Sequence, residues 1–247
     1  MDRLSCHELL KVWETGQHQS LQDRVLTVLG FACPDKTRDQ LGLLTLAQRD
    51  DFLFDLREKT FGPGLTGFAE CPRCTERLEF KMATGDLRGR FSPGADRNDA
   101  VFEVPEEAVR LRFRSPNTAD LVALAACGSA QDGRTQLLKQ CIVEATREGA
   151  ALDVQDLSAE LIHRLSAAML ERQPQAEVLL DLTCPACSHH WQMIFDIAAF
   201  FWVEISAEAR RLLREVHALA SAYGWREEDI LSMSHARRQA YLEMVTS

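Results

Sequence analysis

The sequence lacks a hydrophobic run long enough to cross a membrane and lacks the motifs of the common enzyme classes. A membrane span needs about 18 consecutive apolar residues, and the strongest apolar cluster, MIFDIAAFFWVEI at 193–205, is interrupted by two acids. The chain has no glycine-rich phosphate loop, no nucleophile elbow and no His-Glu-x-x-His pattern. We therefore expect neither a membrane protein nor an enzyme.

The sequence also has no basic excess, and its first residues do not have the pattern expected of a secretory signal. The 28 Lys and Arg are outnumbered by 37 Asp and Glu, which gives a formal net charge of −9. Proteins that track a phosphate backbone usually carry the opposite balance, so nucleic acid is a disfavoured partner. The N-terminus, MDRLSCHELLKVWETG, has no basic start followed by an apolar run. We expect a cytoplasmic protein whose thiols stay reduced.

Four of the eight cysteines form two Cys-x-x-Cys pairs in similar surroundings. Residues 69–80 read AECPRCTERLEF, and residues 180–195 read LDLTCPACSHHWQMIF. In both, proline follows the first cysteine and presets a tight turn. Apolar residues alternate with polar ones beside the turns, which is the period of half-buried strands. Each pair is therefore predicted to lie in the turn of a β-hairpin.

Two such hairpins can bring four thiolates to the corners of a tetrahedron. This is the arrangement of a structural zinc site of the ribbon type. We predict that one structural Zn²⁺ is bound by Cys71, Cys74, Cys184 and Cys187. The pairs lie much further apart than the roughly 15–20 residues of common ribbons, so a large insertion must separate the hairpins. A site of four sulfurs would also suit iron.

Two alternatives to the metal site stay open at the level of sequence. A redox pair needs its first cysteine at a helix N-terminus after a strand, whereas both pairs here lie between strands. The turns could also be vestigial and bind no metal. His189 or His190 could replace a sulfur, but four cysteines already fill a tetrahedron, and we place both histidines on the turn or at a strand start. The cysteines without ligand spacing, which we interpret as small hydrophobic residues, are Cys6, Cys33, Cys127 and Cys141.

The predicted fold class is α+β. It has a zinc-ribbon-like β core built from the two hairpins, with a helical N-terminus, a helical insertion and a helical C-terminal tail. The expected segments are 1–62 (helical), 63–114 (first hairpin, a loop and strands), 115–175 (helical insertion), 176–205 (second hairpin) and 206–247 (C-terminal helices).

Capping signals and periodicity predict the individual elements. Thr45 and Gln48 have the spacing of a capping box at the start of a helix over 45–61. Ser158 and Ser206 are expected to cap two further helices. The remaining predictions are a loop at 83–100, strands at 101–104 and 109–114, a helix opened by residues 115–118 that runs through Ala126, and a helix over 134–147.

Several segments form a series that resembles a known family. They are LTLAQRDDFLFDLREKTFG at 44–62, the two hairpin turns, and RLLREVHALASAYGWREEDILSMSHARRQAYLEMV near the C-terminus. The series is similar to the baseplate hub assembly chaperones of contractile-tail phages and related contractile injection systems. The resemblance covers roughly 42–82 and 176–247 and leaves 83–175 unplaced. Its most specific element is the Tyr223-Gly224-Trp225 turn, followed by Ile230-Leu231, Ser234, Arg237-Arg238 and Tyr241-Leu242.

This resemblance implies a non-enzymatic assembly factor or minor component of a phage-tail-like baseplate. Its partner would be a hub, spike or wedge protein. Zinc would then be a structural elaboration, because the family does not always carry the cysteine turns. We consider Trp225, Arg237 and Arg238 as partner contacts, although Trp225 could simply hold the turn against the core and the arginines could be solvated. The alternative function is a zinc-ribbon adaptor for nucleic acid, with the basic and aromatic hairpin residues Arg73, Arg77, Lys81 and Trp191 at its surface.

Overall fold

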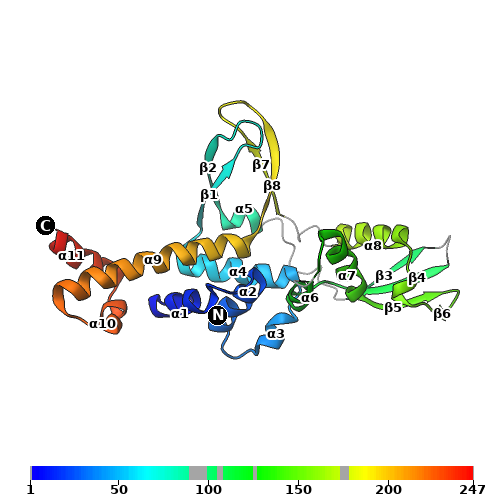
Figure 1. Cartoon of the computed structure of the whole chain (residues 1–247), viewed down its shortest axis with the longest axis horizontal. Coiled ribbons are helices and arrows are strands. Elements are labelled where there is room, and N and C mark those ends of the chain that lie inside the picture. The colour runs from blue at the N-terminus through cyan, green and yellow to red at the C-terminus, as the bar shows by residue number, and fades with distance from the viewer. Residues whose placement is uncertain (1, 89–98, 105–107, 125–126, 173–177, 247) are drawn as a thin grey trace. The chain divides into compact units, whose positions relative to one another are not determined.

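The computed structural model describes residues 2–88, 99–104, 108–124, 127–172 and 178–246 (Figure 1). The fold is α+β, as predicted. Its contacts divide the chain into two compact units, of which the first contains Met1–Lys36, Leu53–Pro63 and Asp196–Ser247 and the second contains Thr37–Phe52 and Gly64–Phe195. No helix within the described ranges combines the length and the apolar character that a membrane crossing requires.

The first unit is helical and is organised around one long helix, α9. Helices from both ends of the chain contact α9, and so does the second half of α4 (Figure 1). A close approach occurs at Gly16, where an added Cβ would lie 2.3 Å from the indole of Trp202. The helices of this unit are α1 (Cys6–Gly16), α2 (Leu21–Ala32), the second half of α4 (Leu46–Phe61), α9 (Ile197–Tyr223), α10 (Glu227–Ser232) and α11 (His235–Thr246).

Helix α9 begins well before Ser206, so the predicted start was wrong. The side chain of Asp196 caps the helix by accepting from the amides of Ala198 and Ala199. Ser206 instead lies inside the helix, where its hydroxyl donates to the carbonyl oxygen of Trp202 at 2.8 Å. The apolar run at 193–205 is therefore partly helix, and the predicted boundary between the second hairpin and the tail falls within α9. Gly224, with a φ of 67°, ends the helix in the left-handed conformation that favours glycine.

A buried ion pair joins α4 to α9 in the first unit. The guanidinium of Arg57, whose side chain is only 2 % exposed, donates to both carboxylate oxygens of Glu204 at 2.9 and 2.6 Å. It also donates to the carbonyl oxygen of Gly62 at 2.6 Å. This fork geometry fixes the end of α4 against α9 through charge-assisted hydrogen bonds.

The second unit contains the two predicted hairpins and a module inserted between them. Strand β1 (Gly64–Glu70) pairs antiparallel with β2 (Arg77–Ala83), and β7 (Val178–Thr183) pairs antiparallel with β8 (His190–Phe195). Each hairpin is a separate two-stranded sheet. The two predicted hairpins are present, but they do not share a sheet, because the described strands form three sheets and the strands of the insertion pair among themselves.

The inserted module has a four-stranded antiparallel sheet and its own hydrophobic core. The strand order is β3-β4-β5-β6. Leu111 and Phe113 of the sheet pack in one cluster with Leu161 and Leu165 of α8. The elements of the module are β3 (Asp99–Val104), β4 (Val109–Arg114), α6 (Thr118–Ala123), α7 (Ala130–Cys141), β5 (Ile142–Arg147), β6 (Ala150–Ala151), the short 3-10 helix η3 (Val154–Asp156) and α8 (Ala159–Arg172). The unit also contains α3 (Arg38–Gly42) and α5 (Thr84–Arg88).

The helix predicted over 134–147 is two elements. Helix α7 ends at Cys141, and β5 follows at once, paired with β4 from Val109 to Phe113. The apolar positions Leu138, Cys141 and Ala145 fit a helical period, and all three are buried. Leu138 and Cys141 lie on α7, however, whereas Ala145 lies on β5. Pairing with β4 decides the conformation of β5, because strand preference depends mainly on neighbours in the sheet. The predicted helical insertion at 115–175 is thus a mixed module of helices and strands.

Predictions based on side-chain caps and alternation were confirmed elsewhere. Thr45 and Gln48 make both hydrogen bonds of a capping box, at 3.1 and 3.3 Å. Ser158 caps α8 by accepting from the amide of Leu161. Strand β4 has the predicted bounds, 109–114. The predicted loop at 83–100 contains α5, and its residues 89–98 lie outside the described residues, as do residues 125–126 of the predicted helix before α7.

The Arg57–Glu204 pair generates the first prediction. Glu204→Gln keeps the shape of the side chain but leaves a buried guanidinium without its counter-charge. We expect the free energy of unfolding to fall by about 2–3 kcal/mol, somewhat less than for a fully buried pair, because the Glu204 side chain is 24 % exposed. Urea unfolding followed by circular dichroism measures this loss.

The matched control is Asp55→Asn on the same helix. Asp55 pairs with Lys59 at 2.8 Å, but both side chains are well exposed, at 36 % and 45 %. Such a pair contributes about 0.5 kcal/mol or less. Equal destabilisation by the two substitutions would show that the Arg57–Glu204 pair has no special role in holding α4.

Candidate metal centre

The first Cys-x-x-Cys turn is a tight knuckle between β1 and β2. The amide of Cys71 donates to the carbonyl oxygen of Glu76 at 2.9 Å, and the amide of Thr75 donates back to the carbonyl oxygen of Cys71 at 2.9 Å. Thr75 has a φ of 61°. This left-handed conformation is strained for a β-branched residue and costs on the order of 1–3 kcal/mol. The strain persists because the hydrogen bonds on both sides fix the turn.

The second knuckle repeats this backbone geometry. The amide of Cys184 donates to the carbonyl oxygen of His189 at 2.9 Å. The amide of Ser188 donates to the carbonyl oxygen of Cys184 at 3.0 Å. Ser188, the residue after the second cysteine, has a φ of 54°. Two segments far apart in the sequence therefore form the same turn, with the same residue position in the left-handed region.

In each hairpin one strand alternates between buried and exposed residues. In β1, Leu65 and Ala69 are buried while their neighbours in the strand, Thr66 and Glu70, are exposed. The buried positions of β7 are Val178, Leu180 and Leu182. Alternation places these apolar side chains on one face of each hairpin.

The four sulfur atoms of the knuckles converge. All lie within 4.8 Å of one another. The Sγ atoms of Cys71 and Cys187 are 3.7 Å apart, and those of Cys74 and Cys184 are 3.5 Å apart. Sulfurs at a Zn–S distance of about 2.3 Å in a tetrahedron would lie ~3.8 Å from one another. The donor set and its spacing therefore fit a tetrahedral metal ion, and these four residues could hold one.

The thiols influence one another's ionisation. Burial raises the pKa of Cys71, but hydrogen bonds with the backbone amides of Arg73 and Cys74 and with the thiols of Cys74 and Cys184 outweigh it and bring that pKa down to about 7. For Cys74 the backbone amide of Glu76 acts to lower the pKa, yet hydrogen bonds with the neighbouring cysteines and burial raise it to about 12. The backbone amide of His189 acts to lower the pKa of Cys187, yet burial and hydrogen bonds with Cys184 and Cys71 raise it. Four thiolates this close need a cation to be stable together, and a divalent metal ion would supply that charge.

The other candidate ligands lie apart from this cluster. His190 starts β8 and its Nδ1 lies 2.9 Å from the hydroxyl of Thr183, while His189 stacks on Trp191, so both stand where the sequence placed them. Cys141 is fully buried, and burial raises its pKa to about 12. Across the described ranges, the four knuckle cysteines are the one group of three or more Cys, His, Asp or Glu residues whose ligand atoms converge in this way.

The proposed partner residue Trp225 belongs to an aromatic patch in the first unit. Its ring stacks on Tyr223 with a centroid distance of 4.5 Å and meets the edge of Tyr241 at 4.8 Å. The guanidinium of Arg237 lies 5.7 Å from the centre of the Tyr241 ring, and Arg237 is exposed. We call Tyr223, Trp225, Arg237 and Tyr241 the aromatic patch.

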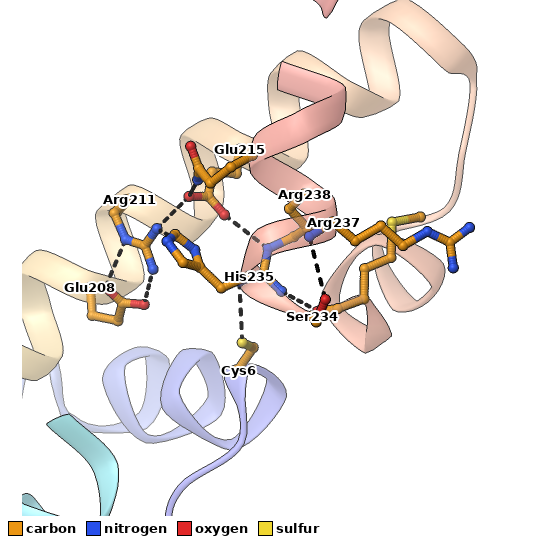
Figure 2. Close-up of polar contacts among 10 residues, drawn as sticks. Cys6, Glu208, Arg211, Glu215, Ser234, His235, Arg237 and Arg238 are labelled. Atoms are coloured by element: carbon orange, nitrogen blue, oxygen red, sulfur yellow. Dashed lines mark hydrogen bonds and ion pairs between the residues drawn. The ribbon is translucent and has the colours of Figure 1, made fainter. Parts of the chain in front are cut away.

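Arg238 has an internal role. It is 1 % exposed, and its Nε donates to the buried carboxylate of Glu215 at 2.9 Å (Figure 2). Its other donors reach the carbonyl oxygen of Met233 and the sulfur of Cys6. We therefore keep the partner-contact prediction for Trp225 and Arg237 and assign Arg238 to the attachment of α11 to α9.

Glu215 is a residue that sequence reasoning missed. It is 5 % exposed and accepts from Arg211, Arg238 and Gln239 (Figure 2). The spacing of Arg211 and Glu215 signals a pair on one helix face. The contacts with Arg238 and Gln239 come from a different helix and have no signal in the sequence.

The comparison with protein families identifies the chain. Residues 6–202, well over half of its length, match the family model described as T4 bacteriophage base plate protein. No curated protein and no solved structure matches significantly. The match includes both knuckles. It also includes the inserted module, a segment that the sequence resemblance did not cover. It ends before the Tyr223-Gly224-Trp225 turn, which was the most specific element of that resemblance. The chain therefore belongs to the family of T4 bacteriophage base plate proteins.

Proposed function

We propose that this protein is a non-enzymatic assembly factor or minor component of a contractile-tail baseplate, and that a structural zinc ion joins its two hairpins. The family match supports the baseplate role. The convergence of four cysteine sulfurs within 4.8 Å supports the metal. Four thiolates fill a tetrahedron and leave no open position for water, so the zinc supplies structure and not catalysis.

Zinc would stabilise the hairpins by linking them. A two-stranded hairpin is marginal by itself in water, and each of these hairpins is a sheet of two strands. Each contributes two ligands, so the ion cross-links segments on either side of the inserted module. Cys71 and Cys184 are buried, whereas Cys74 is exposed, which gives a chelator access to one side of the site.

The proposed partner is a hub, spike or wedge protein, bound at the aromatic patch. Tyr, Trp and Arg are the side chains that most often dominate protein interfaces. The rings of the patch already hold one another, so little side-chain entropy would be lost on binding. The ion pair of Arg238 with Glu215 fixes α11, which carries Tyr241 and Arg237, against α9.

The nucleic-acid adaptor is less well supported. Lys81 of the first hairpin pairs with Glu79 at 3.1 Å, so that hairpin does not present an unbroken basic surface. With a net charge of −9, the chain also carries an acidic excess.

The metal proposal predicts one zinc per chain in protein purified without chelator. Cys184→Ser removes a ligand and should abolish stoichiometric zinc, while Cys127→Ser, outside the cluster, should retain it. Inductively coupled plasma mass spectrometry measures the metal content and also distinguishes zinc from iron. Wild-type protein without metal, or equal zinc in both variants, would refute the site.

A second prediction concerns stability. Because ligand binding and folding are coupled, Cys71→Ser should lower the free energy of unfolding by several kcal/mol, and chelation of the wild-type protein should have a comparable effect. Hydrogen exchange should report the loss of protection in all four strands of the two hairpins. If chelation leaves both the melting temperature and the exchange of β1, β2, β7 and β8 unchanged, no structural metal is present.

The partner proposal predicts that Trp225→Ala weakens binding to the hub, spike or wedge protein encoded with this chain by about 30-fold or more, since an interface anchor contributes at least 2 kcal/mol. Co-purification followed by calorimetry measures it. Point substitution is preferable to deletion of 206–247, because that deletion would cut α9 and remove buried Leu212 and Leu219.

The control for Trp225→Ala is Trp191→Ala, a second partly exposed tryptophan, which lies on β8. Circular dichroism should show that both variants fold. An unchanged affinity in Trp225→Ala would remove the aromatic patch as the contact site. Salt-sensitive binding to single-stranded DNA, lost in Trp191→Ala, would instead favour the adaptor.

A further inference from the structure

A pocket of about 380 Å³ lies between α7 and α8 of the inserted module. Its lining includes two cationic side chains, Arg134 and Lys139 of α7, together with the imidazole of His163 from α8. None of the described residues that line it carries a carboxylate, and none is a knuckle cysteine. The pocket is thus a cationic site in a chain with an excess of acids.

The two permanent cations are held in place by neutral groups. Arg134 donates to the hydroxyl of Ser166 at 2.6 Å, and Lys139 donates to the amide oxygen of Gln155 at 2.9 Å. Each bond uses one donor, whereas a guanidinium has five N–H groups and an ammonium has three. Both side chains are therefore positioned and still have donors to offer.

Other arginines of the same module are matched with acids. On β4, Arg110 pairs with Glu103 at 3.2 Å, and Arg112 pairs with Glu144 at 3.3 Å. Within the described part of the chain, neither Arg134 nor Lys139 has such a carboxylate partner. The positive charges of Arg134 and Lys139 are therefore available to an anionic group from outside the module.

The floor of the pocket is apolar and belongs to the core. Leu138 and Leu157 are buried, and Ile162 is half-buried against the cluster that contains Leu157 and Leu161. Ala159, the first residue of α8, also lines the pocket, so the positive end of that helix adds to its field. The nearby acids Asp156 and Glu160 are exposed and are not among the lining residues.

We propose that this pocket binds an organic anion with a short apolar stem. The guanidinium and ammonium would hold the anionic group, most favourably a carboxylate in two-pronged contact with Arg134. The stem would cover Leu138, Leu157 and Ile162. Such a group is found on a free organic acid and on an acidic side chain of another protein. The site is separate from the zinc and partner contacts proposed above.

Methyl NMR of the full-length protein tests the proposal with hexanoate as the probe. Hexanoate should give saturable shifts of the Leu138, Leu157 and Ile162 methyl signals. It should bind about tenfold more tightly than acetate, which lacks the stem, and than 1-hexanol, which lacks the charge. The absence of saturable shifts at these three residues would overturn the proposal.

Charge variants test the assignment of the cations. The double variant Arg134→Gln, Lys139→Gln should weaken hexanoate binding by about tenfold or more. The control, Arg110→Gln with Arg112→Gln, changes the charge equally on β4 and should bind as the wild type does. Equal affinities in both variants would also overturn the proposal. Zinc content and partner affinity should be unchanged in both, which separates this test from those of the proposed function.

A final comparison distinguishes the two sources of the anion. The blocked dipeptide acetyl-Leu-Glu-amide presents an acidic side chain beside an apolar one. Tighter binding of the dipeptide than of hexanoate assigns the pocket to a protein partner. Tighter binding of hexanoate assigns it to a free organic acid.

Discussion

The meeting of the two Cys-x-x-Cys turns is the contact on which the second unit depends. Each turn closes a two-stranded hairpin, and such a hairpin has too little buried surface to be stable alone. The strands of the insertion pair only among themselves within the described residues, so they add no third strand to either hairpin. What unites the two turns is the cluster of four sulfurs. The left-handed Thr75 and Ser188 are held in place by the backbone hydrogen bonds that close the two turns.

In the first unit, buried ion pairs join segments that are far apart in the sequence. Arg57 and Arg238 are almost completely buried, and each meets a glutamate of α9, at Glu204 and Glu215. Buried ion pairs of this kind contribute little net stability compared with apolar residues, but they penalise any arrangement that leaves one charge unpaired. Helices from distant parts of the chain are in this way held in defined positions along α9. The exposed aromatic patch at the end of α9 is presented on a rigid support as a result.

This division suits a baseplate protein that makes several contacts. The insertion has its own core, centred on Leu111, Phe113 and Leu161, so it can vary or bind without disturbing the knuckles. Its cationic pocket and the aromatic patch lie in different units and have different chemistry. Under the proposals above, one partner would contact the aromatic rings and an anionic group would enter the pocket.

Local signals in the sequence determined much of the structure. The two Cys-Pro-x-Cys turns, the alternation beside them and the Thr45–Gln48 capping box depend on neighbouring residues, and all were read correctly because local geometry depends on little else. The repetition of the knuckle was sufficient to name the four cysteines that converge. The repeated turn can be recognised in the sequence without knowing how the residues between its two copies fold.

Tertiary contacts decided the rest. Residues 142–147 fit a helical period, yet they form β5 because β4 offers a partner whose position no local pattern reveals. The start of α9 was missed because Asp196, which sits within an apolar run, was taken as an interruption and not as a cap. From the sequence alone, Arg238 could be a solvated surface residue. In the fold it is buried and paired with Glu215 of another helix. Propensity and capping act over a few residues, whereas strand pairing, the partners of buried charges and the convergence of sulfurs depend on segments that only the folded chain brings together.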